Sequence, residues 1–176
     1  FFDFAREPDN SITPFFSRRI GLDASGRPQR VDYGTKLTGQ VGAHDLGVLH
    51  VRAAGSSNSS TDENFTVFRA KRRFLRQSYA GLLYTRRSAS DSSVSDRQTF
   101  GADFELATSG FRGSQNLQMS GFYLRTTGTR RAPDQAAYGL RVEYPNDVWA
   151  LQMAFREVQP GYDPAVGFID RRNIRR

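Results

Sequence analysis

The sequence predicts an all-β fold, an antiparallel up-and-down meander of about nine to ten strands that forms part of a transmembrane β-barrel. Three observations predict it. Segments of about ten residues alternate apolar and polar side chains, tight turns alternate with long polar loops, and the charged residues of a segment keep to one parity. Alternation with a period of two places apolar and polar side chains on opposite faces of a strand. One face of the predicted sheet therefore suits hydrocarbon, and the other suits water.

The segment Val31–Val41 shows the alternation most clearly, and it returns in Phe100–Leu106, Tyr138–Tyr144 and Trp149–Arg156. A strand of roughly ten residues, rising about 3.3 Å per residue and tilted by about 45°, spans roughly 24 Å. That span matches the apolar band of an outer-membrane barrel. In the first segment the apolar parity consists of Val31, Tyr33, Leu37 and Val41, and the polar parity of Asp32, Lys36, Thr38 and Gln40.

The connections between these segments alternate in length. Short links follow Val41, Phe74 and Tyr144, whereas the links 55–64, 88–98 and 127–135 are long or rich in polar residues. Bacterial barrels have short periplasmic turns and longer extracellular loops. The short links should therefore lie on the periplasmic side.

The two ends of the chain extend this pattern. We expect residues 13–22 to form a strand that ascends to a loop at 23–30, and Val166 to begin a descending strand, which gives about nine complete strands and part of a tenth. Residues 1–12 are then a periplasmic-side lead-in and residues 13–176 a segment of a larger barrel. Because an open sheet edge in lipid leaves backbone groups unpaired, this excerpt should not close alone, and we expect it to derive from a longer secreted precursor.

Two of the predicted strands depart from a clean alternation. Leu117–Thr126 changes parity near Gly121, which predicts a β-bulge at that glycine. The strand Tyr79–Arg86 carries apolar residues on both parities.

Composition and charge exclude several classes of protein. Only 38% of the residues are hydrophobic and the mean hydropathy is -0.59, which is low for a chain with a large globular core. The absence of cysteine excludes a disulfide framework and a thiolate metal site. The net charge is +7, but the basic residues, all arginine except Lys36 and Lys71, are interleaved with 18 acidic residues. A nucleic-acid interface gathers its charge on one face, so we expect no nucleic-acid partner.

A resemblance to a known family begins at Pro14–Gly21, with the sequence Pro-Phe-Phe-Ser-Arg-Arg-Ile-Gly. With the further matches, this octet resembles an uncharacterised family of Gram-negative outer-membrane β-barrels that follow an N-terminal domain similar to family-9 carbohydrate-binding modules. The resemblance implies contact with polysaccharide through that domain, which lies outside this chain, and it implies no catalytic residues. The further matches are Tyr33–Gly39, Leu46–Leu49, Arg69–Arg73, Ser78–Gly81 and Tyr162–Arg172.

The sequence offers few candidate catalytic or metal-binding residues. His44 and His50 lie on either side of a predicted turn boundary, and they are better explained as a turn histidine and a lumen histidine than as a metal pair. A nucleophilic or general-base enzyme at the barrel rim is the less favoured alternative, since neither histidine lies beside the long loops. Calcium in the long loops is another such alternative; its candidate ligands are Asp62, Glu63, Asp91 and Asp96. We therefore expect no catalytic residue, no metal and no cofactor.

The polar parity gives the most informative set of residues. It is expected to face the lumen, where opposite charges on neighbouring strands pair and keep the wall rigid, or where a charged constriction selects solutes. The candidates that line the lumen are Lys36, Arg69, Lys71, Arg73, Asp103, Glu105, Arg141, Glu143 and Arg156. Aromatic residues suited to the membrane interfaces are Tyr33, Tyr84, Tyr138, Tyr144 and Trp149.

Taken together, the sequence predicts a porin-like or solute-handling segment of a barrel in the bacterial outer membrane. Its expected partners are outer-membrane lipid and, through the domain outside this chain, polysaccharide. One alternative is a soluble antiparallel β-barrel that binds a small apolar ligand, with Val31, Tyr33, Phe104 and Leu140 pointing inward. The other is the rim hydrolase.

Overall fold

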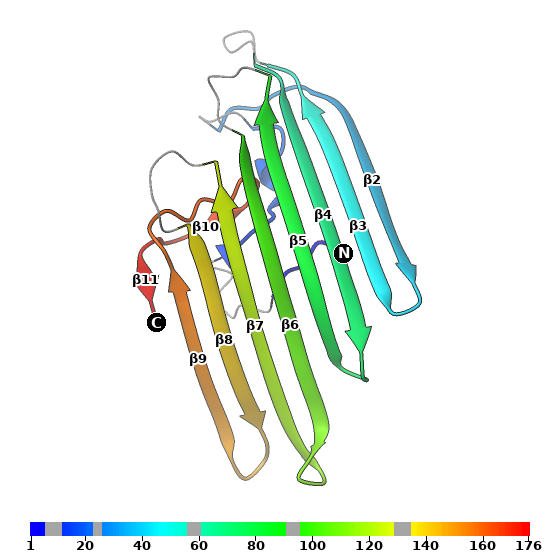
Figure 1. Ribbon diagram of the computed structural model, residues 1–176, viewed down its shortest axis with the longest axis vertical. Coiled ribbons are helices and arrows are strands. Elements are labelled where there is room, and N and C mark those ends of the chain that lie inside the picture. The colour runs from blue at the N-terminus through cyan, green and yellow to red at the C-terminus, as the bar shows by residue number, and fades with distance from the viewer. Residues whose placement is uncertain (6–11, 23–25, 56–60, 91–95, 129–134) are drawn as a thin grey trace.

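The protein is built around one antiparallel β-sheet, seen in a computed structural model that describes residues 1–5, 12–22, 26–55, 61–90, 96–128 and 135–176. Within these residues the sheet has nine strands in the order β11-β9-β8-β7-β6-β5-β4-β3-β2 (Figure 1). Sequential neighbours from β2 to β9 pair with each other, so the predicted meander is confirmed. The strands are β2 (Val31–Val41), β3 (His44–Ala53), β4 (Glu63–Phe74), β5 (Ser78–Ala89), β6 (Arg97–Phe111), β7 (Gln115–Thr127), β8 (Ala136–Pro145), β9 (Ala150–Val158) and β11 (Ile174–Arg175).

The connections lie at two ends of the sheet according to length. The links 42–43, 75–77, 112–114 and 146–149 are at one end, and the strand ends that the links 54–62, 90–96 and 128–135 join are at the other (Figure 1). Gly42 opens the shortest link with a φ of 57°, a conformation that two-residue hairpin turns require and that glycine adopts without strain. The alternation of short and long connections is therefore a property of the fold.

The sheet is open, with β2 at one edge and β11 at the other. The strand expected at residues 13–22 is absent, and this prediction is wrong. The segment instead contains β1 (Ile12–Thr13) and a short 3-10 helix, η1 (Ser17–Arg19). Pro14 has no N–H to give to a strand ladder, and Gly21 has a φ of 79°, so the segment cannot continue as a regular strand.

The segment after Val166 is likewise not a long descending strand. It forms β10 (Phe168–Ile169), which pairs with β1, and then β11, which pairs with Glu157 and Val158 at the end of β9. Phe16 donates a backbone hydrogen bond to the carbonyl oxygen of Val166 over 2.8 Å. The two terminal segments are thus held to each other, and residues 13–22 do not belong to the wall that the long strands form.

Both terminal segments pack on one face of the sheet, which we call the inner face; in Figure 1 they pass behind the strands. The core lies between these segments and the half of the sheet nearer the long connections. One cluster contains Ile12, Phe122, Leu124, Ala137, Val158 and Tyr162, and the other contains Val51, Ala53, Phe65, Ala165 and Val166. The opposite face of the sheet is called the outer face.

The bulge expected at Gly121 is not present, because the register of β7 with both neighbours runs through it unbroken. The change of parity has another cause. Phe122 and Leu124 are apolar on the inner face because the terminal segments cover them there. Leu83 is also buried on the inner face, at 2% exposure, which accounts for the mixed parity of β5.

Register shifts occur elsewhere, between Thr108 and Phe111 and between Val31 and Tyr33. The second shift pairs Val31 with Ala53, an inner-face residue, whereas Tyr33 pairs with Arg52 on the outer face. Strict alternation predicted that Val31 and Tyr33 share a face. The register shift separates them, so this prediction is wrong for Val31.

Candidate functional site

The nine residues predicted to line a lumen all lie on the inner face. The ladders across the sheet show this directly, since Lys71, Asp103 and Arg156 share one row through Gly81, Phe122 and Gly139. The next row contains Arg73, Glu105 and Arg141. Lys36, Arg69 and Glu143 have the same orientation in neighbouring rows. The period of two in the sequence thus places this whole set on one side of the sheet.

Arg69 and Asp103 form the centre of the inner face. Arg69 Nη1 donates to Asp103 Oδ1 over 2.6 Å, and Nη2 donates to Oδ2 over 2.9 Å. Their side chains are 1% and 0% exposed. The guanidinium crosses β5 over Gly81, where a side chain would leave no room for it. Paired geometry of this kind is what allows two charges to remain ionised away from water.

The first residues of the chain cover this ion pair. The Ala5 amide donates to Asp103 Oδ2 over 3.1 Å, and the ring of Phe4 lies 5.3 Å from the Arg69 guanidinium. The Tyr79 hydroxyl donates to the same carboxylate over 3.3 Å. Asp103 thus accepts hydrogen bonds from two strands and from the N-terminal segment, and it ties that segment to the wall.

A second ionic contact secures the same segment. Lys71 Nζ donates to Asp3 Oδ2 over 2.8 Å and lies 4.5 Å from the ring of Tyr79. Partial burial alone would raise the pKa of Asp3, but the hydrogen bond and positive charge of Lys71 outweigh it, with help from the N-terminus and Arg69, so the pKa is lowered. The carboxylate of Asp3 therefore stays ionised against Lys71.

The part of the inner face nearer the short connections is polar and partly open. Arg73 pairs with Asp45 at 3.4 Å, and Arg141 pairs with Glu143 on its own strand. Glu105 accepts a hydrogen bond from Gln118 over 3.0 Å. Positive and negative groups alternate across this surface, as expected for paired charges on neighbouring strands.

Sequence reasoning missed the ionic contacts near the long connections. Arg87 makes a forked contact with Glu63 at 2.6 and 2.9 Å, and Arg97 Nη1 lies 2.6 Å from Asp163 Oδ2. Arg172 binds the other oxygen of Asp163 at 2.8 Å. The parity rule was sufficient to place Glu63 and Arg87 on the inner face; no pattern in the sequence pointed to the contact between β6 and the C-terminal segment.

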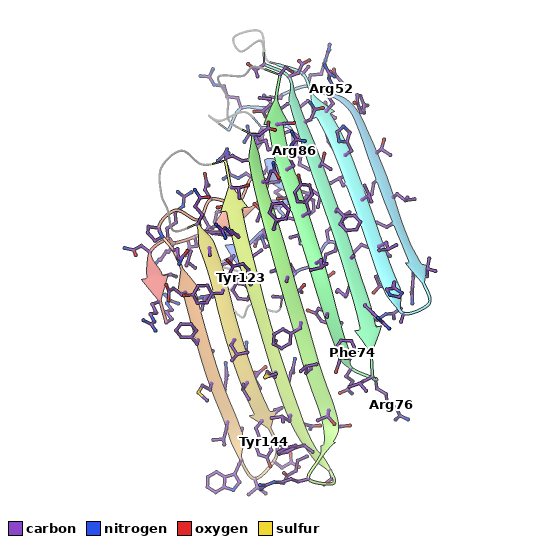
Figure 2. The ribbon with its side chains drawn as sticks, in the orientation of Figure 1. Arg52, Phe74, Arg76, Arg86, Tyr123 and Tyr144 are labelled. Atoms are coloured by element: carbon purple, nitrogen blue, oxygen red, sulfur yellow. The ribbon has the colours of Figure 1, made fainter. Side chains whose placement is uncertain are left out.

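The outer face carries an apolar band across the eight long strands. Its exposed members include Leu37 at 71%, Leu82 at 60% and Met153 at 72%. Figure 2 shows Arg52 and Arg86 toward the long-connection end, Tyr123 midway and Tyr144 near the short-connection end. The members of the band are Leu37, Val41, Leu46, Val48, Phe68, Ala70, Ala80, Leu82, Tyr84, Phe100, Ala102, Phe104, Leu106, Leu117, Met119, Tyr123, Tyr138, Leu140, Val142, Tyr144, Leu151, Met153 and Phe155.

Four of the five predicted interface aromatics, the tyrosines, lie on this outer face. They are packed against other rings, with centroid distances of 6.0 Å for Tyr33 and His50 and 5.0 Å for Tyr84 and Phe100. Tyr138 similarly contacts Phe155. The fifth predicted aromatic is Trp149, which lies in the connection between β8 and β9 and is 68% exposed.

The two histidines occupy the outer face as well, so the expectation of a lumen-facing His50 is wrong. His50 follows the outward parity of β3, and its Nδ1 lies 3.0 Å from Thr66 Oγ1. A hydroxyl beside an imidazole resembles a nucleophile with its base, but within the described chain no carboxylate orients this ring. His44 begins β3 opposite Arg72, away from His50 along the strand.

The acidic residues proposed for calcium are engaged by arginine where they are described. Asp62 binds Arg52 Nη2 at 2.6 Å, Glu63 binds Arg87, and Asp96 binds Arg86. The Gly55 amide and then Arg52 lower the pKa of Asp62. Asp91 lies outside the described residues. No group of three or more histidine or acidic residues suited to a metal occurs in the described parts of the chain.

Comparison of the chain with protein families, with curated proteins and with solved structures finds no match. The resemblance to the family of outer-membrane barrels therefore stays a prediction. In the described residues, no helix has the length and apolar character needed to cross a membrane.

Proposed function

We propose that this chain forms part of the wall of a transmembrane β-barrel in the bacterial outer membrane, with a porin-like or solute-handling role. The observation that carries the proposal is the apolar band on the outer face of eight consecutive strands, many of whose large side chains are exposed. Large apolar patches on a protein surface mark contact with a membrane or a partner. Arginine and tyrosine near the ends of the band suit the polar interfaces of a bilayer.

The position of the band on successive strands agrees with this role. On β6 it runs from Phe100 to Leu106, roughly 20 Å along the strand at about 3.3 Å per residue, or roughly 14 Å across the bilayer at a tilt of about 45°. The band shifts along the strands from β2 to β9, as the staggered hairpins in Figure 1 do. Such stagger is the geometry of tilted strands in a barrel wall, and a level bilayer would then cross all eight strands.

The edges of the sheet support a wall that continues. Within the described residues, β2 pairs with β3 alone, and β11 pairs only with the last residues of β9. In hydrocarbon each unpaired backbone group costs several kcal/mol, so strands outside this sheet complete the closure in the proposed barrel.

The inner face points to a narrow path for solutes. The terminal segments cover its half near the long connections, and the paired charges of Arg73, Asp45, Arg141 and Glu143 face the remaining space. A path bordered by both signs of charge suits small polar solutes, whereas a ring of one sign selects anions or cations. The link to polysaccharide rests on the resemblance alone.

The alternative of a soluble ligand-binding barrel requires the apolar outer residues to face a cavity. Phe104 and Leu140 lie on the face opposite the packed terminal segments, whereas the packed face holds the buried pair of Arg69 and Asp103. The observed arrangement favours the membrane proposal because an ion pair and its polar neighbours are suited to the interior of a barrel wall that faces water.

Single-cysteine labelling tests the proposal cleanly because the chain has no cysteine of its own. Gln152 and Met153 are adjacent and exposed, and they lie on the inner and outer faces of β9. In the protein folded into lipid vesicles, a water-soluble maleimide should label Gln152→Cys and leave Met153→Cys unmodified until detergent dissolves the vesicles. Equal, rapid labelling of both residues in vesicles would contradict the placement of the outer face in lipid.

Conductance tests the solute-handling role separately. The complete protein in a planar bilayer should pass small ions, and the current should change when Arg141 and Glu143 are replaced by glutamine. If the labelling pattern holds while the bilayer shows neither conductance nor solute uptake, the wall remains and the solute-handling role is lost.

A further inference from the structure

Small side chains open a hollow in the outer face. Ala70, Ala80 and Ala102 come from three neighbouring strands, and the larger Leu82, Phe104 and Tyr123 border the space beside them. Its volume is about 590 Å³, and its surface is predominantly apolar. Sites that hold small molecules commonly have volumes of about 300–1,000 Å³.

A second hollow of about 340 Å³ continues the first toward the long connections. The two share Leu82, Ala102 and Tyr123, and the second extends to Phe68 and Phe100. Together they make an elongated apolar depression that runs along the strands within the outer band. An extended hydrocarbon chain fits this shape and chemistry, whereas a compact polar ligand does not.

Arg72 gives the first hollow a positive charge at the end nearer the short connections. His44 and Arg72 line this end from opposite positions on β3 and β4. Arg72 is exposed and makes no ion pair or hydrogen bond within the described chain, although Arg52 and Arg86 of the same face are both held by aspartates. An unpaired guanidinium at the end of an apolar groove complements a ligand with one anionic head and a long apolar tail.

We infer that this depression binds one anionic phospholipid of the surrounding bilayer, with its phosphate at Arg72 and His44 and an acyl chain over Ala70, Leu82 and Ala102. The inference rests on the proposed membrane location and specifies which lipid that surface selects. The phosphate lies at the level of the short connections, and the chain extends toward the middle of the band. Basic side chains beside apolar transmembrane surfaces bind anionic headgroups in this way.

Fluorescence quenching tests the site in the complete protein folded into vesicles. In a Trp149→Phe background, Tyr123→Trp places the sole tryptophan of this chain at the wall of the hollow. Dibrominated phosphatidylglycerol and dibrominated phosphatidylcholine are then compared at equal mole fractions. Phosphatidylglycerol should show an apparent association at this position about fivefold stronger, the effect of about one favourable arginine contact.

Matched variants separate the site from general attraction to the surface. Arg72→Gln should abolish the preference, whereas Arg76→Gln, in the same hairpin but beyond the end of β4, should retain it (Figure 2). Ala102→Leu should fill the hollow and reduce quenching by both lipids, while Ala154→Leu on the inner face should not.

The outcomes distinguish the two proposals. Equal quenching by both lipids, or equal losses from Arg72→Gln and Arg76→Gln, overturns the phospholipid site and leaves the membrane wall in place. Absence of quenching by either lipid overturns both. Preference for free brominated fatty acid over the phospholipid would replace the lipid headgroup with a carboxylate and overturn the inference as stated.

Discussion

Arg69 on β4 reaches across β5 to Asp103 on β6, and the two side chains meet in a two-pronged ion pair that is almost entirely shielded from solvent. The pair bridges strands that are not hydrogen-bonded to each other. Asp103 also accepts hydrogen bonds from the Ala5 amide and the Tyr79 hydroxyl. One carboxylate therefore joins the sheet to the N-terminal segment. The ion pair and its hydrogen bonds thus connect β4, β5 and β6 with the N-terminal segment.

Removing one partner should be far worse than removing both. Asp103→Asn leaves the Arg69 charge buried without compensation, and we expect the free energy of unfolding to fall by about 3–5 kcal/mol. The double variant Arg69→Met, Asp103→Leu should recover most of that loss. Urea unfolding of the protein in vesicles measures both. Asp45→Asn, which breaks the exposed pair with Arg73, is the control and should cost less than about 1 kcal/mol. Equal losses in Asp103→Asn and Asp45→Asn would show that burial does not govern the pair.

A side chain at position 81 should destabilise the protein, because the Arg69 guanidinium occupies the space where a Cβ of residue 81 would lie. A Cβ at Gly81 would lie 2.5 Å from Arg69 Nη1 and 2.8 Å from Cζ. The guanidinium is fixed by Asp103, so Gly81→Ala should lower the free energy of unfolding by about 1–3 kcal/mol. Gly39→Ala is the matched control on β2, since no atom lies within 4 Å of its Cβ. A Gly81→Ala protein as stable as Gly39→Ala would mean that Arg69 has another low-energy position.

The period of two made the long strands and the two faces predictable from the sequence. Lys71, Asp103 and Arg156 share a face because each lies on the polar parity of its own strand. The register between neighbouring strands then places them in one row. This relationship is local in each strand. Strand and turn chemistry therefore predicted the meander and the shared face of the charged residues without any knowledge of tertiary contacts.

The inner core could not be predicted in the same way. Phe122 and Leu124 break the alternation of β7 because they contact residues distant in sequence, such as Tyr162. The prediction interpreted that break as a bulge at Gly121, since period alone cannot distinguish a change of register from a covered face. Residues 13–22 were misassigned for a related reason. Their apolar side chains pack on a sheet already formed by other strands, and packing of that kind leaves no periodic pattern in sequence.

Acid should release the N-terminal segment through Asp3. The contact with Lys71 lowers the pKa of Asp3 below its ordinary value of 3.8, so this contact stabilises the docked segment fully above pH 3.8. The stabilisation is lost as the pH falls through the lowered pKa. Hydrogen exchange at the Ala5 amide, which is bound to Asp103, should accelerate below that pH. Asp3→Asn should exchange faster already at neutral pH and should lose this part of the pH dependence. Identical profiles for the two proteins would show that Asp3 does not hold the segment.

The buried hydroxyl of Tyr162 should lower the stability of the contact between the C-terminal segment and the sheet. The side chain is fully buried against the sheet, and within the described chain its hydroxyl has no hydrogen-bond partner. Burial, and then the charge of Asp163, raises the pKa of this hydroxyl, in line with the missing solvation. Tyr162→Phe removes the unsatisfied group and keeps the ring, so it should raise the free energy of unfolding by about 1 kcal/mol.

Tyr162→Ala should lower the free energy of unfolding by about 3–5 kcal/mol by emptying the space between the C-terminal segment and β7. Tyr33→Phe, at an exposed outer position, should change it by less than about 0.5 kcal/mol. Opposite signs for the phenylalanine and alanine variants of Tyr162 would locate the stabilisation in the packing of the ring, whereas no effect from either would place the C-terminal segment off the inner face.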